Sequence, residues 1–331
     1  MGAQSSGTNS AVTSNEQARL ASLLGDDASL ERRSVLEVTR ESAAPGAVSF
    51  RSELHDELRL ADEVTELDSV LLSGRADDSW LLEELAVEGG IGLSAAHLVG
   101  QSVLRGFRRQ LDPLKEGTPN EQAMRRMMWD FPLALMINGQ TSSLDHPALK
   151  APQPMGQLPG VNQCSGWRAG GDMLTSIERA GGVLRMKLSD ELVADEHLGD
   201  TDPPPLAPLA SRRRRQLTVR RHGDELVIRD RFRDSYSDPD GIERALHHWI
   251  VDVRAGVLDH VITQVEVTSR ALPWLECPSA GGSGVRLVGH SLEEAEVLVG
   301  TEFKGITTCT HLNDTLVMLS GVPEMLSRLL F

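Results

Sequence analysis

The hydrophobic pattern predicts β-strands over much of the chain. Polar and apolar positions alternate from Val257 to Thr268 with the period of two that a strand shows. Residues 216–219 and 225–228 flank a His-Gly-Asp sequence and predict a β-hairpin. A further strand opens at residue 247 and runs to residue 253, and residues 47–72 predict extended segments that are broken by acidic turns.

Three other segments have apolar side chains three and four positions apart, which predicts helices at residues 16–24, 81–85 and 93–111. Residues 124–136 form a dense apolar segment of methionine and aromatic residues. Such a stripe is typical of a buried core rather than of a cofactor site. The acidic, proline-containing stretch at residues 230–241 predicts a loop that is rich in turns.

Changes in composition divide the chain into four parts. Ser, Gly, Thr and Asn crowd the first residues, which predicts a disordered tail. A Pro-, Gly- and Gln-rich stretch lies between residues 142 and 160, and Pro203-Pro204-Pro205 marks a second, stiff connector. The predicted parts are the tail at 1–16, a degenerate N-terminal repeat at 17–145, a linker region with the segment Cys164 to Trp167 at 146–210, and a C-terminal motif-bearing domain at 211–331.

Two stretches of the sequence resemble each other and indicate a duplication. Leu54-His55-Asp56 is followed by Gly100, which lies 45 residues after the histidine, and Leu246-His247-His248 is followed by Gly289, 42 residues after His247. The two glycines lie in the similar sequences Ala-His-Leu-Val-Gly-Gln-Ser and Val-Arg-Leu-Val-Gly-His-Ser. The first copy lacks the cysteines and the histidine of the second, so we expect the C-terminal half to be the active one.

Charge and cysteine content narrow the function classes. The net charge of −15 disfavours nucleic acid, because phosphate binding draws its affinity from clustered Lys and Arg. The run Arg212 to Arg215 predicts a solvated strand edge, with a clamp for phosphate or carboxylate as the alternative. No apolar run reaches the ~18 to 20 residues of a membrane span, and three cysteines do not make a disulfide framework. We expect a cytoplasmic protein with a small-molecule substrate and no nucleic-acid or membrane partner, and a homodimer stays open.

Two short motifs near the end of the sequence carry the candidate chemistry. Cys277 precedes Pro278, and proline is favoured at the first position of a helix. Cys309 precedes Thr310-His311 and an apolar pattern that predicts the start of another helix. The unpaired amides at a helix N-terminus favour a thiolate, so we expect both cysteines to be unusually acidic.

Three interpretations of these motifs stay open. In the first, Cys277, Cys309 and His311 bind zinc or iron together with His247 or His248, as a tetrahedral set of sulfur and nitrogen ligands. In the second, Cys277 is a nucleophile and one of the three histidines is its base. In the third, the two thiols and the imidazole are buried and have no chemical role.

Three further residues are candidates for contact with a substrate. Arg168 lies among the small residues that follow Cys164, and Arg214 lies in the arginine run. A guanidinium at either position could hold a substrate carboxylate. Trp274, three residues before Cys277, is the third candidate, and Cys164 itself remains a candidate for the site.

Four stretches of the sequence resemble a bacterial domain family of unknown function in its actinobacterial form: residues 230–240, 247–249, 272–278 with Glu-Cys-Pro, and 308–316 with Thr-Cys-Thr-His-Leu-Asn-Asp. This resemblance extends over about residues 210–325 and implies no activity. Members often have His-Asp where this chain has His247-His248, which puts a carboxylate role at position 248 in doubt.

A more distant resemblance, in the order of elements, is to iron–sulfur scaffold proteins of the NifU type. In those proteins a strand residue, a cysteine that opens a helix and a His-Cys pair that opens the last helix hold zinc or a cluster. Here the last pair is reversed and spaced by Thr310. The resemblance implies an α+β fold with a mostly antiparallel sheet. Together with the internal repeat it leads us to expect two related halves, each a mostly antiparallel sheet with helices packed on one face.

The hypothesis from the sequence is therefore an enzyme of lyase or hydrolase type that acts on a small molecule. Its site in the C-terminal half would use His247, His248, Cys277 and His311 for catalysis and would hold zinc or iron through Cys277, Cys309, His311 and His247. The alternatives are a non-enzymatic carrier or scaffold for a metal or an iron–sulfur cluster, and a cysteine-nucleophile enzyme without a metal.

Overall fold

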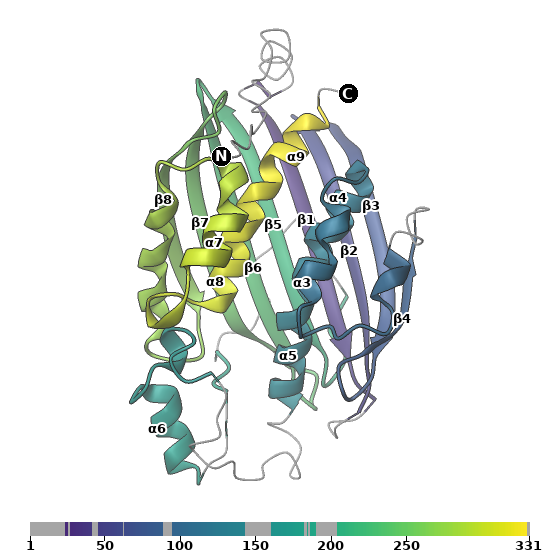
Figure 1. The fold of residues 1–331 in the computed structure, drawn as a ribbon, viewed down its shortest axis with the longest axis vertical. Helices are drawn as coiled ribbons and strands as arrows, with labels where there is room; N and C mark the ends of the chain where they lie inside the picture. Colours follow the sequence, from purple (N-terminus) through teal and green to yellow (C-terminus); the bar gives the residue numbers. More distant parts are fainter. Residues whose placement is uncertain are drawn as a thin grey trace, which may run out of the picture.

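The protein is built on one eight-stranded antiparallel sheet with the strand order β4-β3-β2-β1-β5-β6-β7-β8 (Figure 1). The structure is a computed structural model that describes residues 24–25, 27–41, 46–61, 63–88, 95–142, 160–181, 184, 186–189 and 204–329. The strands are β1 (Ala28–Thr39), β2 (Val48–Leu60), β3 (Glu63–Ala76), β4 (Leu82–Val87), β5 (Ser211–His222), β6 (Glu225–Ser237), β7 (Glu243–Gly256) and β8 (Ile262–Ala271).

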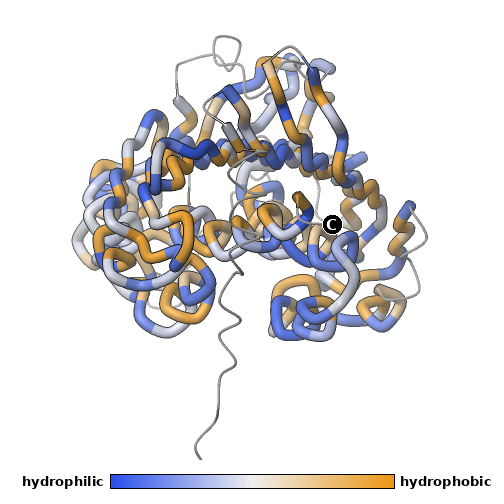
Figure 2. Tube along the Cα trace, turned by 90° about the horizontal axis from the view of Figure 1, so that it is seen from above, coloured by the Kyte–Doolittle hydropathy of each residue, from blue (hydrophilic) through white to orange (hydrophobic). Residues whose placement is uncertain are grey.

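The strands fall into an N-terminal and a C-terminal group of four, and the first strands of the groups, β1 and β5, pair at the centre. Helices follow each group and cover the same face of the sheet (Figure 2). The α-helices are α3 (Phe107–Gln110), α4 (Pro119–Trp129), α5 (Phe131–Ser142), α6 (Asp172–Arg179), α7 (Ala295–Glu302), α8 (Thr310–Met318) and α9 (Val322–Ser327). The 3₁₀ helices are η1 (Ala96–Leu98), η2 (Asp112–Leu114), η5 (Ser165–Trp167), η7 (Cys277–Leu287), η8 (Leu292–Glu294), η9 (Gly305–Thr307) and η10 (Leu319–Gly321). The predicted α+β class with an antiparallel sheet is confirmed.

Each strand group has its own hydrophobic core beneath its helices. In the C-terminal group Phe232 of β6 and Trp249 of β7 pack with Leu312 of α8, because alternate strand residues face the helices. In the N-terminal group Phe50 of β2 packs edge-on against Phe131 of α5. The two cores flank the central pair β1–β5, where buried charged residues replace part of the apolar packing.

The second part of the predicted repeat coincides with matching backbone hydrogen bonds in the two strand groups. The Gly100 amide donates to the carbonyl of Leu82 at the start of β4, and the Gly289 amide donates to the carbonyl of Ile262 at the start of β8. Both glycines have a positive φ, 83° and 89°, which a residue without a Cβ adopts at little cost. The two heptapeptides therefore close equivalent corners of the two groups.

The first part of the predicted repeat has the wrong register. His55 lies on β2, the second strand of its group, whereas His247 lies on β7, the third strand. Strand order and pairing instead match Asp56 with Asp234 and Asp68 with His247. Asp56 lies opposite Asp68 in the N-terminal group as Asp234 lies opposite His247 in the C-terminal group, and a β-bulge follows both facing pairs. Similarity in short tripeptides misled the alignment, and the sheet register corrects it.

Several predicted elements are different in the structure. Of the helix predicted at 81–85, residues 82–85 belong to strand β4, and residues 93–111 are divided by the positive-φ glycines Gly100 and Gly106. The strand predicted from Val257 is a turn up to residue 261, where the Asp259 carboxylate accepts a hydrogen bond from the Val261 amide, and β8 follows. The predicted tail at 1–16 and most of the linker at 146–210 lie outside the described residues.

Two predictions for charged segments are wrong. The predicted loop at 230–241 is mostly strand β6, which continues to Ser237. The arginine run, residues 212–215, is not a solvated edge, because all four side chains are buried on the inner strand β5. Arg212, Arg213 and Arg215 are paired with carboxylates, which is how buried charges are tolerated.

Candidate functional site

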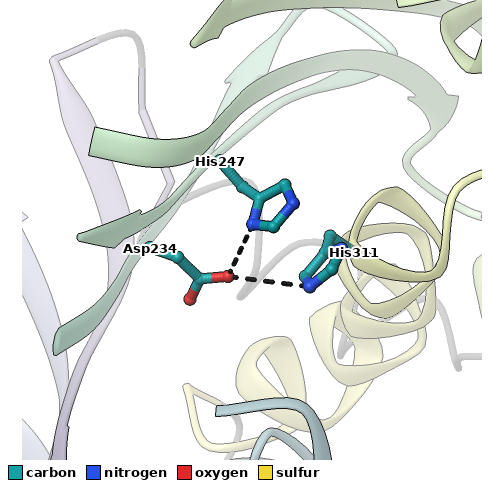
Figure 3. A group of neighbouring side chains, drawn as sticks. All are labelled: Asp234, His247 and His311. Carbon is teal, nitrogen blue, oxygen red and sulfur yellow. Dashed lines mark ion pairs between the residues drawn. The ribbon is translucent and has the colours of Figure 1, made fainter. Parts of the chain in front are cut away.

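Asp234, His247 and His311 form a cluster of three potential metal ligands, called here the Asp–His–His cluster (Figure 3). One ligand atom from each residue lies within 4.8 Å of the others. The Asp234 Oδ2 atom is 3.4 Å from His247 Nδ1 and 4.0 Å from His311 Nε2. Among the described residues this is the one group of three or more His, Cys, Asp or Glu side chains with that geometry.

Sheet register and a helix start bring the three side chains together. Asp234 on β6 lies directly opposite His247 on β7, and a β-bulge follows this pair. Bulges often lie next to functional sites because they redirect the side chains beside them. His311 comes from the first turn of α8, which packs on β7. Its ring stacks on that of His247 with the ring centroids 3.6 Å apart.

Arg213 fixes the carboxylate of the cluster. Its Nε and Nη2 atoms donate to the two oxygens of Asp234 at 2.7 and 2.9 Å, which is the bidentate geometry that guanidinium favours. Burial alone would raise the pKa of Asp234, but the charge of Arg213 and the contact with His247 hold that pKa well below its usual range. The carboxylate is therefore anionic and oriented toward the two imidazoles.

The two histidines are neutral at physiological pH. Burial lowers the pKa of His247 below its ordinary value, and burial together with the neighbouring His247 lowers the pKa of His311 further. The Nδ1 atom of His247 and the Nε2 atom of His311 are both buried and have no hydrogen-bond partner. Because a neutral imidazole nitrogen is a metal ligand, these two atoms are suited to coordinate an ion beside Asp234.

Acid should destabilise the protein through these two imidazoles. Their pKa values are lowered in the folded protein, whereas an unfolded histidine titrates near ~6.5. The contribution of the two neutral imidazoles to the free energy of unfolding is complete above pH ~6.5. It is lost as the pH falls below that value, by up to about 1.4 kcal/mol per pH unit for each histidine. Urea unfolding at pH 7.5 and pH 5 should show a smaller acid loss for the double variant His247→Gln/His311→Gln than for wild type.

The double variant has to be compared with wild type because Asp230 also changes the stability of the protein between these two pH values. Burial raises the pKa of Asp230 to about 6, so its contribution has the opposite sign and is lost as the pH rises toward 6. Comparing wild type with the double variant at the same two pH values cancels this contribution. Equal acid losses in both proteins would contradict the assignment of two neutral, buried imidazoles.

The N-terminal strand group contains a counterpart of the cluster that already holds a cation. Arg32 donates to both oxygens of Asp56 at 2.7 Å, as Arg213 does to Asp234. Asp68 lies opposite Asp56, at the position that matches His247. The Arg328 guanidinium lies between these carboxylates, with Nη1 2.8 Å from Asp56 and a salt bridge to Asp68. At the equivalent place in the C-terminal group the imidazoles face the aspartate instead.

The cysteines of the predicted site are buried beside the Asp–His–His cluster rather than within it. Cys309 is the N-cap residue of α8, as predicted, and its Sγ atom lies 4.0 Å from His311 Nδ1. Cys277 is the first residue of η7. The expected acidity is wrong, since burial raises the pKa of Cys309 to about 12 and that of Cys277 further. Removal from water outweighs the amides at the helix starts.

The other predicted site residues lie apart from the cluster. His248 follows His247 on β7 and therefore points to the opposite face of the sheet. Arg214 is buried next to Arg213 on that same opposite face. Arg168 is exposed beyond η5, and Trp274 is buried against Cys277 with Lys187 over its ring.

Sequence reasoning missed Asp234 and Arg213. Both lie in charged stretches that were interpreted as a loop and as a solvated edge. A signal was present at residues 230–234, where Asp, Phe and Asp alternate with two arginines, because a period of two predicts a strand with one buried face. Alternation within the arginine run also separates Arg213 and Arg215, which face the helices, from Arg212 and Arg214.

Comparison with known protein families finds a family match for one part of the chain. Residues 211–323 match the family model described as protein of unknown function (DUF2889). The C-terminal strand group carries a DUF2889 domain. This domain spans about a third of the chain and contains the Asp–His–His cluster, Arg213, Cys277 and Cys309. No curated protein and no solved structure matches the chain.

The predicted resemblance to a family of unknown function is thus confirmed for the DUF2889 domain. The more specific actinobacterial form and the likeness to NifU-type scaffolds stay predictions. The described helices are all too short or too polar to cross a membrane.

Proposed function

We propose that this protein is a metal-dependent enzyme whose ion is bound by Asp234, His247 and His311. The observation that carries the proposal is the convergence of one carboxylate oxygen and two buried imidazole nitrogens without a hydrogen bond, whose three atoms all lie within 4.8 Å of one another. The N-terminal counterpart supports it, because the matching carboxylate there is neutralised by a second guanidinium, that of Arg328. A bound cation would give Asp234 the same compensation.

The ligand set favours zinc or ferrous iron. Two imidazoles and one carboxylate occur in catalytic zinc sites and in the facial triad of non-haem iron enzymes. In both cases three protein ligands leave coordination positions open for water or substrate. The His311 side chain is 13% exposed, more than those of Asp234 at 2% and His247 at 4%, so the open positions would face the side of α8.

We propose lyase or hydrolase chemistry on a small organic substrate. An ion at this site would lower the pKa of a bound water or polarise a substrate carbonyl. Arg213 would hold the carboxylate ligand in place, since its Nη1 atom also donates to Asp130 and lies 3.6 Å from Asp314 of α8. Asp314 in turn accepts a hydrogen bond from Arg108 at 2.7 Å.

A cavity of about 270 Å³ beside Arg108 is a candidate for the non-reacting part of such a substrate. Gly106, Phe107, Arg109 and Pro132 line it together with Arg108. Mixed apolar and guanidinium lining suits a small molecule that carries an acidic group. The contacts from Arg108 through Asp314 to Arg213 would connect this cavity to the metal ligands.

The two other hypotheses from the sequence have less support. A thiol nucleophile needs thiolate, and the raised pKa values of Cys277 and Cys309 leave little of it at neutral pH. A carrier that delivers its metal to a partner needs exposed ligands, whereas the ligand atoms of the cluster are buried.

Metal analysis of purified protein tests the proposed function. After treatment with a chelator and reloading with zinc or ferrous iron, wild type should retain one equivalent of metal that His247→Ala and His311→Ala both lose, because two ligands do not hold the ion. His55→Ala is the matched control, since His55 is a partly exposed histidine on β2 that pairs with Glu66. Retention of the same metal content by His247→Ala and His311→Ala would refute the proposal.

A further inference from the structure

The three cysteines of the chain, which lie far apart in the sequence, meet at one place in the fold. Cys164 precedes η5, Cys277 begins η7 and Cys309 precedes α8. The 3₁₀ helix η5 packs against both η7 and η9, and η9 leads directly to Cys309. All three thiols are free and buried, with exposed fractions of 8%, 4% and 3%. We call this group the thiol cluster.

Specific contacts attach the Cys164 segment to the DUF2889 domain. The Ser165 amide donates a hydrogen bond to the Thr308 carbonyl at 2.8 Å. The Asp172 amide donates to the Glu276 carboxylate at 2.8 Å, one residue before Cys277. Gly166 lies so close to the Cys277 sulfur that an added Cβ would be 2.6 Å from it. A segment from outside the family match therefore brings a third sulfur to two cysteines of the domain.

The surroundings of the thiol cluster suit a soft metal. Trp274, Met173 and Ile177 pack around Cys277 and exclude water from one side. Backbone amides of Gly166, Trp167 and Thr310 are directed at the Cys164 sulfur, and those of His311 and Leu312 are directed at the Cys309 sulfur. Amides directed at cysteine sulfurs are a common feature of thiolate-bound metals, whose properties they tune.

We propose that Cys164, Cys277 and Cys309 form a second, sulfur-rich site that binds a thiophilic metal centre next to the Asp–His–His cluster. Thiolate ligands select zinc, cuprous copper or iron–sulfur clusters over the ions that prefer oxygen ligands. The three sulfurs are spread more widely than the ligand atoms of the Asp–His–His cluster, since they do not all lie within 4.8 Å of one another. This spread favours an iron–sulfur cluster over a single ion, because the ligands of a cluster are distributed over several metal atoms.

The position of the site suggests how the two centres would be related. The His311 ring directs Nε2 toward Asp234 and has Nδ1 4.0 Å from the Cys309 sulfur, so one imidazole separates the two groups of ligands. Cysteine variants should therefore lose the metal of the thiol cluster, whereas His247→Ala should lose the metal of the Asp–His–His cluster.

Anaerobic reconstitution with iron and sulfide, followed by absorption spectroscopy and iron and sulfide analysis, tests the proposal. Wild type should acquire charge-transfer absorption and stoichiometric sulfide, and Cys164→Ser, Cys277→Ser and Cys309→Ser should each lose at least half of both. His247→Ala should keep them, since that residue belongs only to the Asp–His–His cluster. A parallel reconstitution with zinc alone tests whether the site holds a single ion instead of a cluster. In that case wild type should bind an equivalent of zinc that Cys164→Ser loses and that His247→Ala keeps.

Cys164→Ala serves as a second variant, and circular dichroism of each variant reports its folding. Unchanged iron, sulfide and zinc contents in folded Cys164→Ser or Cys164→Ala would overturn the three-sulfur site. It would also be overturned if wild type bound no metal beyond the equivalent that His247→Ala removes. Neither result would affect the metal proposed for Asp234, His247 and His311, which the histidine variants test separately.

Discussion

Replacing Arg213 with methionine should lower the free energy of unfolding by about 3–5 kcal/mol, because it leaves buried carboxylates without their partner. Arg213 is 2% exposed and pairs with Asp234 and Asp130, which are themselves buried. Methionine fills a similar volume, so the loss would come mainly from the uncompensated charges. Urea unfolding followed by circular dichroism at pH 7.5 measures it.

Arg229→Met is the matched control for this experiment. Arg229 pairs with Asp252 in a similar cross-strand geometry, but the two side chains are 51% and 36% exposed. Exposed pairs typically contribute about 0–1 kcal/mol, so this variant should unfold almost as wild type does. Similar losses for Arg213→Met and Arg229→Met would mean that burial of the pair is not what makes Arg213 important.

Zinc should stabilise wild type by more than it stabilises Asp234→Asn, which lacks the carboxylate ligand of the Asp–His–His cluster. A ligand that binds only the folded protein at 1,000 times its Kd adds about 4.1 kcal/mol to the free energy of unfolding. The amide oxygen of asparagine is a weaker ligand than a carboxylate oxygen, and the loss of the negative charge of Asp234 also removes its attraction for the cation. Thermal unfolding of chelator-treated protein, with and without added zinc, gives the shift for each variant.

Asp56→Asn provides the internal control, because Asp56 occupies the equivalent position in the N-terminal group. It is held by Arg32 and Arg328 and has no histidine opposite it. The substitution should reduce the stability of the protein without zinc and leave the zinc-dependent shift unchanged. A zinc shift in Asp234→Asn as large as that of wild type would contradict binding at Asp234, and any smaller shift that remains should disappear when Cys164→Ser is added.

The sequence indicated the C-terminal part of the site better than the strand part. Cys309 was correctly placed at the start of a helix by the polar residues that precede an apolar face, and His311 follows from it. His247 was identified, but its separation from His248 depends on which face of β7 each side chain takes. Asp234 was missed because acidic residues near Pro239 are typical of loops, and the inner position of β6 reversed that tendency.

Strand assignments failed where pairing partners outweighed local pattern. Residues 28–39 form β1 in the middle of the sheet although charged residues interrupt their apolar positions, since Arg32 is neutralised by Asp56 across the strands. Residues 81–85 have helical spacing, yet residues 82–87 pair with β3 as the edge strand β4. The charge of Arg32 is neutralised by a residue 24 positions away, and β4 forms by pairing with the preceding strand, so neither outcome is contained in the local pattern of the segment itself.

The pairing of β1 with β5 has a consequence for how the protein is made. The end of β1 at Thr39 and the start of β5 at Ser211 are separated by roughly 170 residues, and synthesis of that length takes on the order of 10–30 s at the usual rates. During this time the N-terminal strand group can form its own core, with β1 paired to β2, while the hydrogen-bonding groups on the β5 side of β1 remain unpaired. An open strand edge invites association with other chains, and the charges on β1 are a common protection against it. Arrival of β5 then both completes the sheet and brings Arg213 to its carboxylates, so the metal ligands would be oriented only when the nascent chain has closed this edge.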